Sequence, residues 1–132
     1  MAIDLLAIEN AIIQRLTPLV DEFKVQVGAI DIKRPVVSKQ IFVVYKSTIT
    51  SPVKSFNGLV TKEIRFDVIS RFQELRTNNQ AYPILAKIDE LLEGYEPEPV
   101  RTFNALHQVR EESLPSEVEG LYLYRQIYEM TV

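Results

Sequence analysis

The chain lacks cysteine and tryptophan, and it contains one histidine, four glycines and no long apolar run. Without cysteine it cannot form disulfides, thiolate metal sites or a cysteine nucleophile. The longest uninterrupted apolar run, Ile41–Tyr45, is far below the ~18 residues of a membrane span. Asp4 and Glu9 interrupt any signal-peptide core. We therefore expect an intracellular product that has no membrane partner.

The few glycines and the single histidine exclude several catalytic motifs. Gly28, Gly58, Gly94 and Gly120 are each more than twenty residues apart, so neither a dinucleotide-binding fingerprint nor a P-loop can be written. His107 is the only histidine in the sequence, so the chain cannot form a metal site that needs two histidines. We predict no catalytic residue, no metal and no cofactor.

The residues that are present suffice for one domain. The 132 residues are 46% hydrophobic, enough to bury a core without metal or disulfides. Fifteen basic and 18 acidic residues give a net charge of −3, which argues against nucleic-acid binding through a basic surface, sequence-specific binding included. We predict a single domain over residues 1–132.

Two segments have helical periodicity. Residues 4–20 carry an apolar stripe that begins after Asp4, a predicted N-cap, and a break is expected at Thr17-Pro18. Residues 81–92 carry a second stripe, with Asn78 and Asn79 as predicted caps, Pro83 in the first turn and Gly94 at the exit.

Five segments read as strands, with one long loop in the first half of the chain and an acidic loop near the end. The strands are predicted at 24–30, 41–48, 59–72, 100–110 and 121–132, and the loops at Lys46–Phe56 and Glu111–Gly120. The order α-β-β-β-α-β-β predicts a single-domain α+β fold, a mainly antiparallel sheet with two helices packed on one face.

Charge is divided between two blocks of the chain. Residues 24–65 hold eight basic and two acidic side chains, and residues 89–132 hold ten acidic and three basic ones, local charges of +6 and −7. Adjacent strands could neutralise each other within one subunit. Alternatively, basic loops of one copy meet the acidic loop of the next in a head-to-tail assembly. The candidate contacts are Lys33, Arg34, Lys39, Lys46, Lys54, Glu111, Glu112, Glu117 and Glu119.

The last strand is apolar on both faces. Tyr122, Tyr124 and Tyr128 alternate with Leu123 and Ile127, although helices can cover only one face. The strand could be central and covered by loops. Because tyrosine is enriched in interface cores, we predict that these three tyrosines contribute to an interface.

Several short signatures in this order resemble a known family. They are Ile8–Leu16, Ile41–Lys46, Lys62–Val68, Leu91–Tyr95 and Tyr122–Tyr128. Together they are similar to the small tail terminator, or tail completion, proteins of tailed phages and prophages, including the Mu-like group. The resemblance spans nearly the whole chain.

The resemblance implies a structural virion protein and no enzyme. Such proteins form a ring, usually hexameric, that caps the head-proximal end of the tail tube, stops its polymerisation and offers a docking surface to the neck. The implied partners are further copies, tube protein, the sheath where the tail is contractile, and a neck or connector protein. The implied location is the virion tail or neck, after assembly in the host cytoplasm.

Two alternatives stay open from the sequence. The chain could be another neck ring, such as a head-completion subunit. It could also be a small α+β enzyme or ligand-binding module that uses His107 together with Glu111, which a regular strand would place on the same face.

Overall fold

The computed structural model describes residues 3–29, 39–51, 61–73, 78–97 and 104–132. The helices are α1 (Leu5–Arg15), α2 (Pro18–Phe23) and α3 (Tyr82–Leu92), the last preceded by a 3₁₀ turn at Asn78–Ala81. The strands are β1 (Gln26–Gly28), β2 (Lys39–Ser51), β3 (Thr61–Phe72), β4 (Asn104–Leu114) and β5 (Tyr122–Thr131). This arrangement confirms the predicted α+β class and the predicted element order, with the first helix divided in two.

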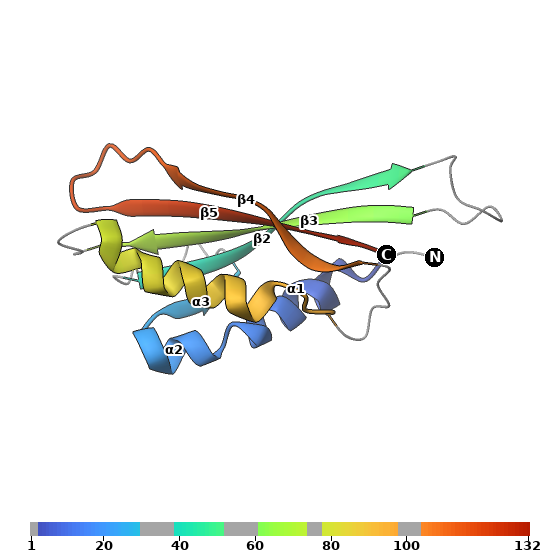
Figure 1. The fold of residues 1–132 in the computed structure, drawn as a ribbon, viewed down its shortest axis with the longest axis horizontal. Helices are drawn as coiled ribbons and strands as arrows, with labels where there is room; N and C mark the ends of the chain where they lie inside the picture. The colour runs from blue at the N-terminus through green and yellow to red at the C-terminus, as the bar shows by residue number, and fades with distance from the viewer. Residues whose placement is uncertain (1–2, 30–38, 52–60, 74–77, 98–103) are drawn as a thin grey trace.

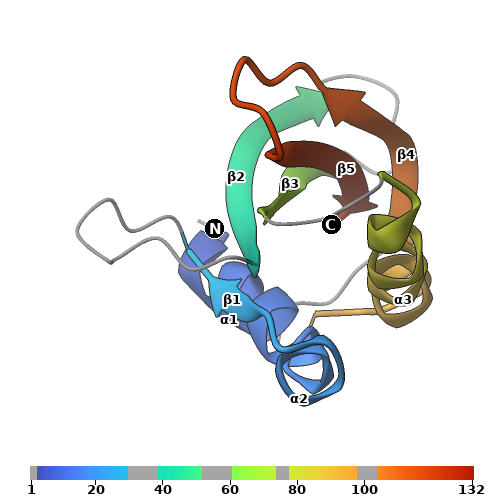
Figure 2. The same ribbon diagram turned by 90° about the vertical axis from the view of Figure 1, so that its left-hand side faces the viewer.

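The strands form one sheet in the order β1-β2-β3-β5-β4. All neighbouring strands pair antiparallel except β1, which runs parallel to β2. One edge of the sheet is formed by the three-residue β1 and, beyond Phe42, by the part of β2 that β1 does not reach, and the other edge is the eleven-residue β4. The helices lie on one side of the sheet (Figure 1), with α1 and α2 near β1 and α3 beneath β4 (Figure 2).

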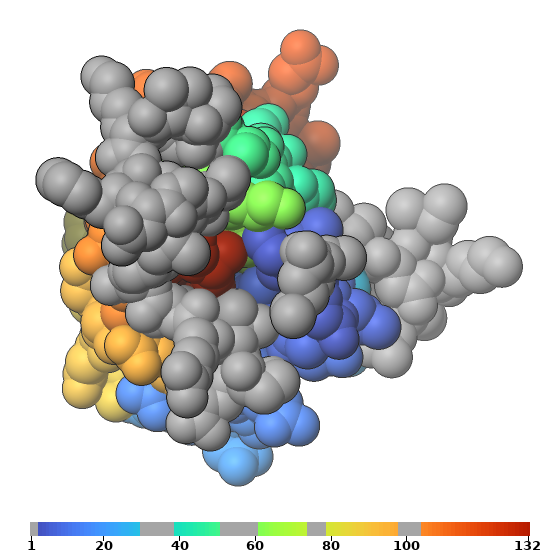
Figure 3. All heavy atoms as spheres, turned by 90° about the vertical axis from the view of Figure 1, so that its right-hand side faces the viewer, coloured from blue at the N-terminus to red at the C-terminus, as the bar shows by residue number. Residues whose placement is uncertain are grey.

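The core lies between the helices and one face of the sheet. The two central strands, β3 and β5, send alternate side chains into it, and Phe66, Tyr128 and Met130 are fully buried there. The helices contribute the stripes that their periodicity predicts: Ile8, Ile12, Leu19, Ile84, Leu85, Ile88 and Leu92. From the end at which the chain terminates, the last residues of β5 are seen between α1 and β4 (Figure 3).

The predicted start and break of the first helix are confirmed. Asp4 Oδ1 accepts a hydrogen bond from the Ala7 amide at 3.0 Å, as an N-cap should. Pro18 opens α2, because proline fits the first turn of a helix but not its interior. Helix α2 ends at Phe23, and the next residue, Lys24, caps it in the left-handed backbone conformation at φ 57°.

The predicted asparagine cap of α3 is wrong. The N-cap is Ala81, and no side chain accepts a hydrogen bond there, because Asn78 and Asn79 are part of the 3₁₀ turn that leads into the helix. Pro83 does occupy the first turn, and Gly94 follows the helix with φ at 79°, as predicted.

Two strands extend into segments that were predicted as loops. Strand β2 continues to Ser51, so residues 46–51 of the predicted Lys46–Phe56 loop are strand, and residues 52–56 lie outside the described residues. Strand β4 runs to Leu114, so Glu111 and Glu112 belong to a strand instead of the acidic loop. Each extension is held by a long neighbour, β3 for β2 and β5 for β4.

We predict that Lys24→Gly raises the free energy of unfolding by about 1 kcal/mol, because glycine adopts the left-handed conformation without the steric cost that a side chain has there. The same change at Lys87, inside α3, should lower it by about 1 kcal/mol, since glycine is a poor helix former. Urea denaturation of both variants measures the difference. A loss of stability at Lys24 would contradict the prediction.

Candidate subunit and partner interface

The twelve predicted interface residues do not gather on one surface. Lys33, Arg34 and Lys54 lie outside the described residues. Lys39 begins β2, and its Nζ lies 3.5 Å from the Phe23 carbonyl oxygen. Lys46 occupies a bulge in β2, where the pairing with β3 shifts register. The basic candidates that are described therefore lie on the β1–β2 side of the sheet, away from the acidic ones on β4 and its following loop.

Two of the three predicted interface tyrosines belong to the subunit core. Tyr124 is 3% exposed and Tyr128 is fully buried, which corrects their prediction as interface residues. Tyr122 is half-buried and packs against the same core. The physical reason is the position of β5 between β3 and β4: its tyrosine face is the one that the helices cover. The alternative prediction of a central strand is correct in position, but helices and not loops cover the tyrosine face.

A polar network joins α3 to β4 and β5. The Tyr128 hydroxyl donates to Asp89 Oδ1 at 3.0 Å and accepts from Gln108 Nε2 at 3.2 Å. Burial raises the pKa of Tyr128, so the phenol stays protonated and can donate. The amide of Gln126 donates to the Leu85 carbonyl at 3.0 Å and to Glu111 Oε1 at 2.8 Å. These bonds fix the distance between α3 and the edge strand.

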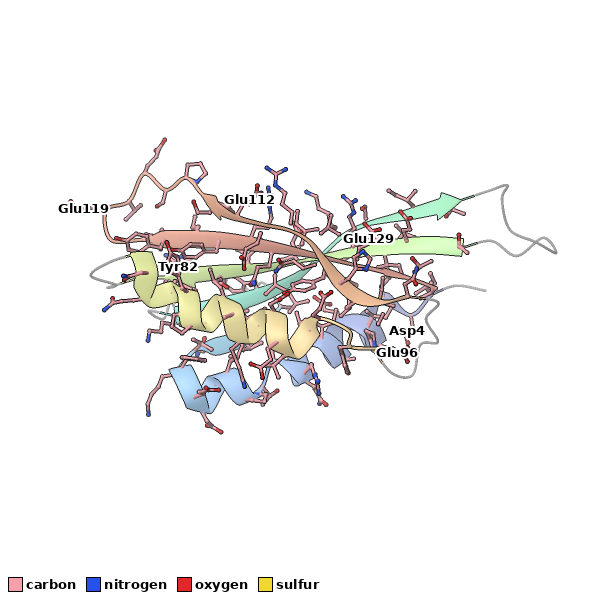
Figure 4. The ribbon with its side chains drawn as sticks, in the orientation of Figure 1. Asp4, Tyr82, Glu96, Glu112, Glu119 and Glu129 are labelled. Carbon is pink, nitrogen blue, oxygen red and sulfur yellow. The ribbon has the colours of Figure 1, made fainter. Side chains whose placement is uncertain are left out.

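A shallow groove runs between α3 and β4. Two adjoining hollows share Tyr82, Leu85 and Glu111, and one of them continues over Ser113 and Tyr124. Tyr82, the first residue of α3, lines this groove and is 53% exposed; it lies below β5 in Figure 4. An exposed aromatic ring beside a strand edge is the kind of apolar anchor that protein interfaces use.

One half of the β4 edge is already occupied. The Leu106 amide donates to the Tyr95 carbonyl at 3.0 Å, and the Leu106 carbonyl accepts from the Gly94 amide at 2.8 Å. The Gln108 amide donates to Glu93 Oε2 at 2.7 Å. Past a bulge between Gln108 and Arg110, the rest of the strand has no such cover from the described residues.

The sheet face opposite the helices carries ion pairs. Arg65 Nε lies 2.7 Å from Glu129 Oε2, a pair that joins the basic block to the acidic block within one subunit. Glu112 pairs with Arg110 at 2.8 Å and with Arg125, whose hydrogen bond holds the pKa of Glu112 below its usual range. Neutralisation inside the subunit therefore accounts for part of the charge division, Glu112 included. Figure 4 shows Glu112 and Glu129 on this face.

The β4–β5 loop keeps its charge. Glu117 and Glu119 are exposed and make no ion pair with any residue that the structure describes, whereas Glu111 on β4 already accepts from Gln126. Glu119 projects from one end of the molecule in Figure 4. This loop and the neighbouring half of β4 form the acidic surface that remains available to a partner.

Asp67 is a buried carboxyl on the same face as the ion pairs. It is 4% exposed, and its Oδ1 has no hydrogen-bond partner among the described residues. Burial raises its pKa, and the nearby cations Arg125, Lys46 and Arg65 offset only part of that shift. Asp67 alternates along β3 with the core residues Phe66 and Val68, which puts it on the face opposite the helices, and nothing in the sequence signals that it is buried there.

His107 does not share a face with Glu111. His107 is exposed opposite Glu129, whereas the Glu111 side chain reaches the buried Gln126 on the helix side. The β4 bulge after Gln108 shifts the alternation by one residue, which separates the pair that a regular strand would have joined.

Within the described residues there is no group of three or more His, Cys, Asp or Glu able to hold a metal ion. None of the described helices is long and apolar enough to cross a membrane.

The fold has a counterpart among solved structures. The chain is similar to one from the "Virion of native gene transfer agent (GTA) particle", with a TM-score of 0.76 over 94% of this chain and 92% of that one. The two sequences are 13% identical, so the likeness establishes a shared fold. No family model and no curated protein matches the sequence.

We predict that Asp67→Asn stabilises the protein by about 1 kcal/mol at pH 7, because asparagine has the shape of aspartate but does not place a charge in this buried position. The raised pKa means that the folded state binds a proton that the unfolded state has released, so wild-type stability falls as pH rises through the folded pKa. The difference in stability between Asp67→Asn and wild type should therefore shrink as pH is lowered toward 4.

Urea denaturation at several pH values measures the Asp67 effect, with Asp21→Asn on the exposed surface of α2 as the matched control. The control should change stability little at any pH. A destabilised Asp67→Asn protein at pH 7 would contradict the prediction.

Proposed function

We propose that this chain is a structural virion protein, a ring-forming tail terminator. In this proposal several copies, six as the resemblance to tail terminators implies, cap the head-proximal end of a tail tube, stop its polymerisation and offer a docking surface to the neck. The observation that carries the proposal is the shared fold, over nearly the full length of both chains, with a chain from a virion particle.

The surface of the subunit supports assembly. The acidic β4–β5 loop and the exposed half of β4 lie at one edge of the sheet, and the described cations Lys24 and Lys39 lie near the other edge. Unlike surfaces on one molecule generate head-to-tail contacts, and such contacts close into a ring when the rotation between copies permits it. Complementary charge would fix the register of those contacts.

The direct test is to measure mass and location together. Native mass spectrometry at low salt should show closed rings of the purified protein, alone or after tail-tube protein from the same particle is added. Electron microscopy with gold-labelled protein should place the label at one end of each tube. A protein that stays monomeric and never binds tube ends would refute the proposal. Label at the neck, apart from tube ends, would favour the neck-ring alternative.

We predict that Glu117→Lys combined with Glu119→Lys weakens ring formation at least tenfold while the monomer stays folded, because both side chains are exposed and make no ion pair among the described residues. Raised salt should weaken wild-type rings in the same direction by screening. Light scattering across a concentration series measures the change.

The matched control is Glu90→Lys with Glu96→Lys, which alters net charge equally at two exposed positions outside both β1 and the β4–β5 loop. Rings of this control should form as in wild type. Equal weakening in both double variants would assign the effect to net charge and would contradict a docking role for the β4–β5 loop.

A further inference from the structure

The exposed half of β4 presents backbone groups that point away from the sheet. In a strand of L-residues, the face taken by a side chain fixes the side to which its amide points. Leu106 and Gln108 have side chains on the helix side, and their amides point away from β5. Glu111 and Ser113 also have side chains on that side, so their amides point the same way.

The two halves of this edge differ in what covers them. Residues 93–95 already bond to Leu106 and Gln108. For Glu111 and Ser113, no hydrogen bond from the described part of the chain reaches the backbone groups that face away from β5. An edge strand with free amides and carbonyls is a template for one more strand. The open stretch of β4 has room for a short one.

We propose that the added strand is β1 of a second copy, so that the sheets of neighbouring subunits become continuous. This inference rests on the proposed ring and names its contact. Strand β1 forms the opposite edge of the sheet beside residues 40–42 of β2, has no second partner strand among the described residues, and is three residues long, which suits the short open stretch of β4. Val27 pairs with the buried Ile41, so its side chain lies on the helix side of the sheet. The Ser113 side chain lies on the same side. A continued sheet would keep both on one face.

Charge complementarity favours this partner. The segment from Lys24 to Lys39 holds four cations and one carboxylate, whereas Glu111, Glu117 and Glu119 lie on or beside the open half of β4. Lys24 is exposed directly before β1, in a backbone conformation that favours glycine. A charged side chain kept there at a steric cost is consistent with a contact that needs its charge. Tyr82 in the adjoining groove offers the incoming strand an apolar surface.

Disulfide trapping tests the contact directly, since the natural chain has no cysteine. Val27→Cys protein is mixed with Ser113→Cys protein under mild oxidation, and the mixed dimer is identified by mass. We expect at least tenfold more mixed dimer than from Asn10→Cys with Ser113→Cys, because Asn10 is exposed on helix α1 and lies on no strand edge. Equal yields from the two mixtures, in preparations that form rings, would overturn the inference and leave the proposed function standing.

Ser113→Pro supplies a second test. Proline removes the amide that would bond to the added strand, and it is tolerated on an edge strand where that amide faces solvent. We expect rings to weaken at least tenfold, while Ser113→Ala, which keeps the amide, forms rings like wild type. Circular dichroism checks that the proline variant is folded, and if it is not, the disulfide comparison decides. Rings of undiminished stability from folded Ser113→Pro protein would overturn the inference. Failure of the wild-type protein to oligomerise, even with tube ends, would refute the proposed function and the contact together.

Discussion

The burial of one face of β3 and β5 beneath the helices is the constraint on which the other features depend. Phe66, Tyr128 and Met130 lose all contact with solvent on that face, and each buried side chain of this size contributes about 1.5–3 kcal/mol. Because all three helices are used on this side, the opposite face has to satisfy its own charges through pairs such as Arg65 with Glu129. Among the described residues, backbone groups then remain available on the sheet edges: on β1, on the part of β2 beyond Phe42, and on the half of β4 past its bulge.

Periodicity was enough to predict the layers of the fold. The apolar stripes of α1 and α3, the alternation of Ile64, Phe66 and Val68, and the break at Pro18 are local signals, and each corresponds to what the structure contains. Strand ends were harder to predict, because β2 and β4 continue for as long as a neighbouring strand pairs with them. That partner lies far away in sequence, so no local pattern reports it.

The candidate interface was less predictable than the fold. Tyr124 and Tyr128 were assigned to an interface because sequence alone does not say which face of β5 the helices cover. The bulge in β4 reverses the facing of Glu111 relative to His107, and bulges leave little trace in one sequence. Gln126 did offer a signal, since a polar residue between tyrosines on one strand face needs a partner when that face is buried. The division of charge was visible in the sequence, whereas its partial neutralisation by the pair of Arg65 with Glu129 is visible only in the structure.

The occupied half of β4 has a consequence for how the protein behaves at high concentration. Long, bare edge strands recruit copies of themselves without limit and lead to cross-β aggregates. The segment at Glu93–Tyr95 shortens the bare part of this strand, and the bulge beside it interrupts a flat register. The β4 edge of a newly made subunit can therefore offer enough backbone for a specific contact and too little to seed a fibre. The strand that we propose to be used during assembly therefore also limits aggregation before assembly.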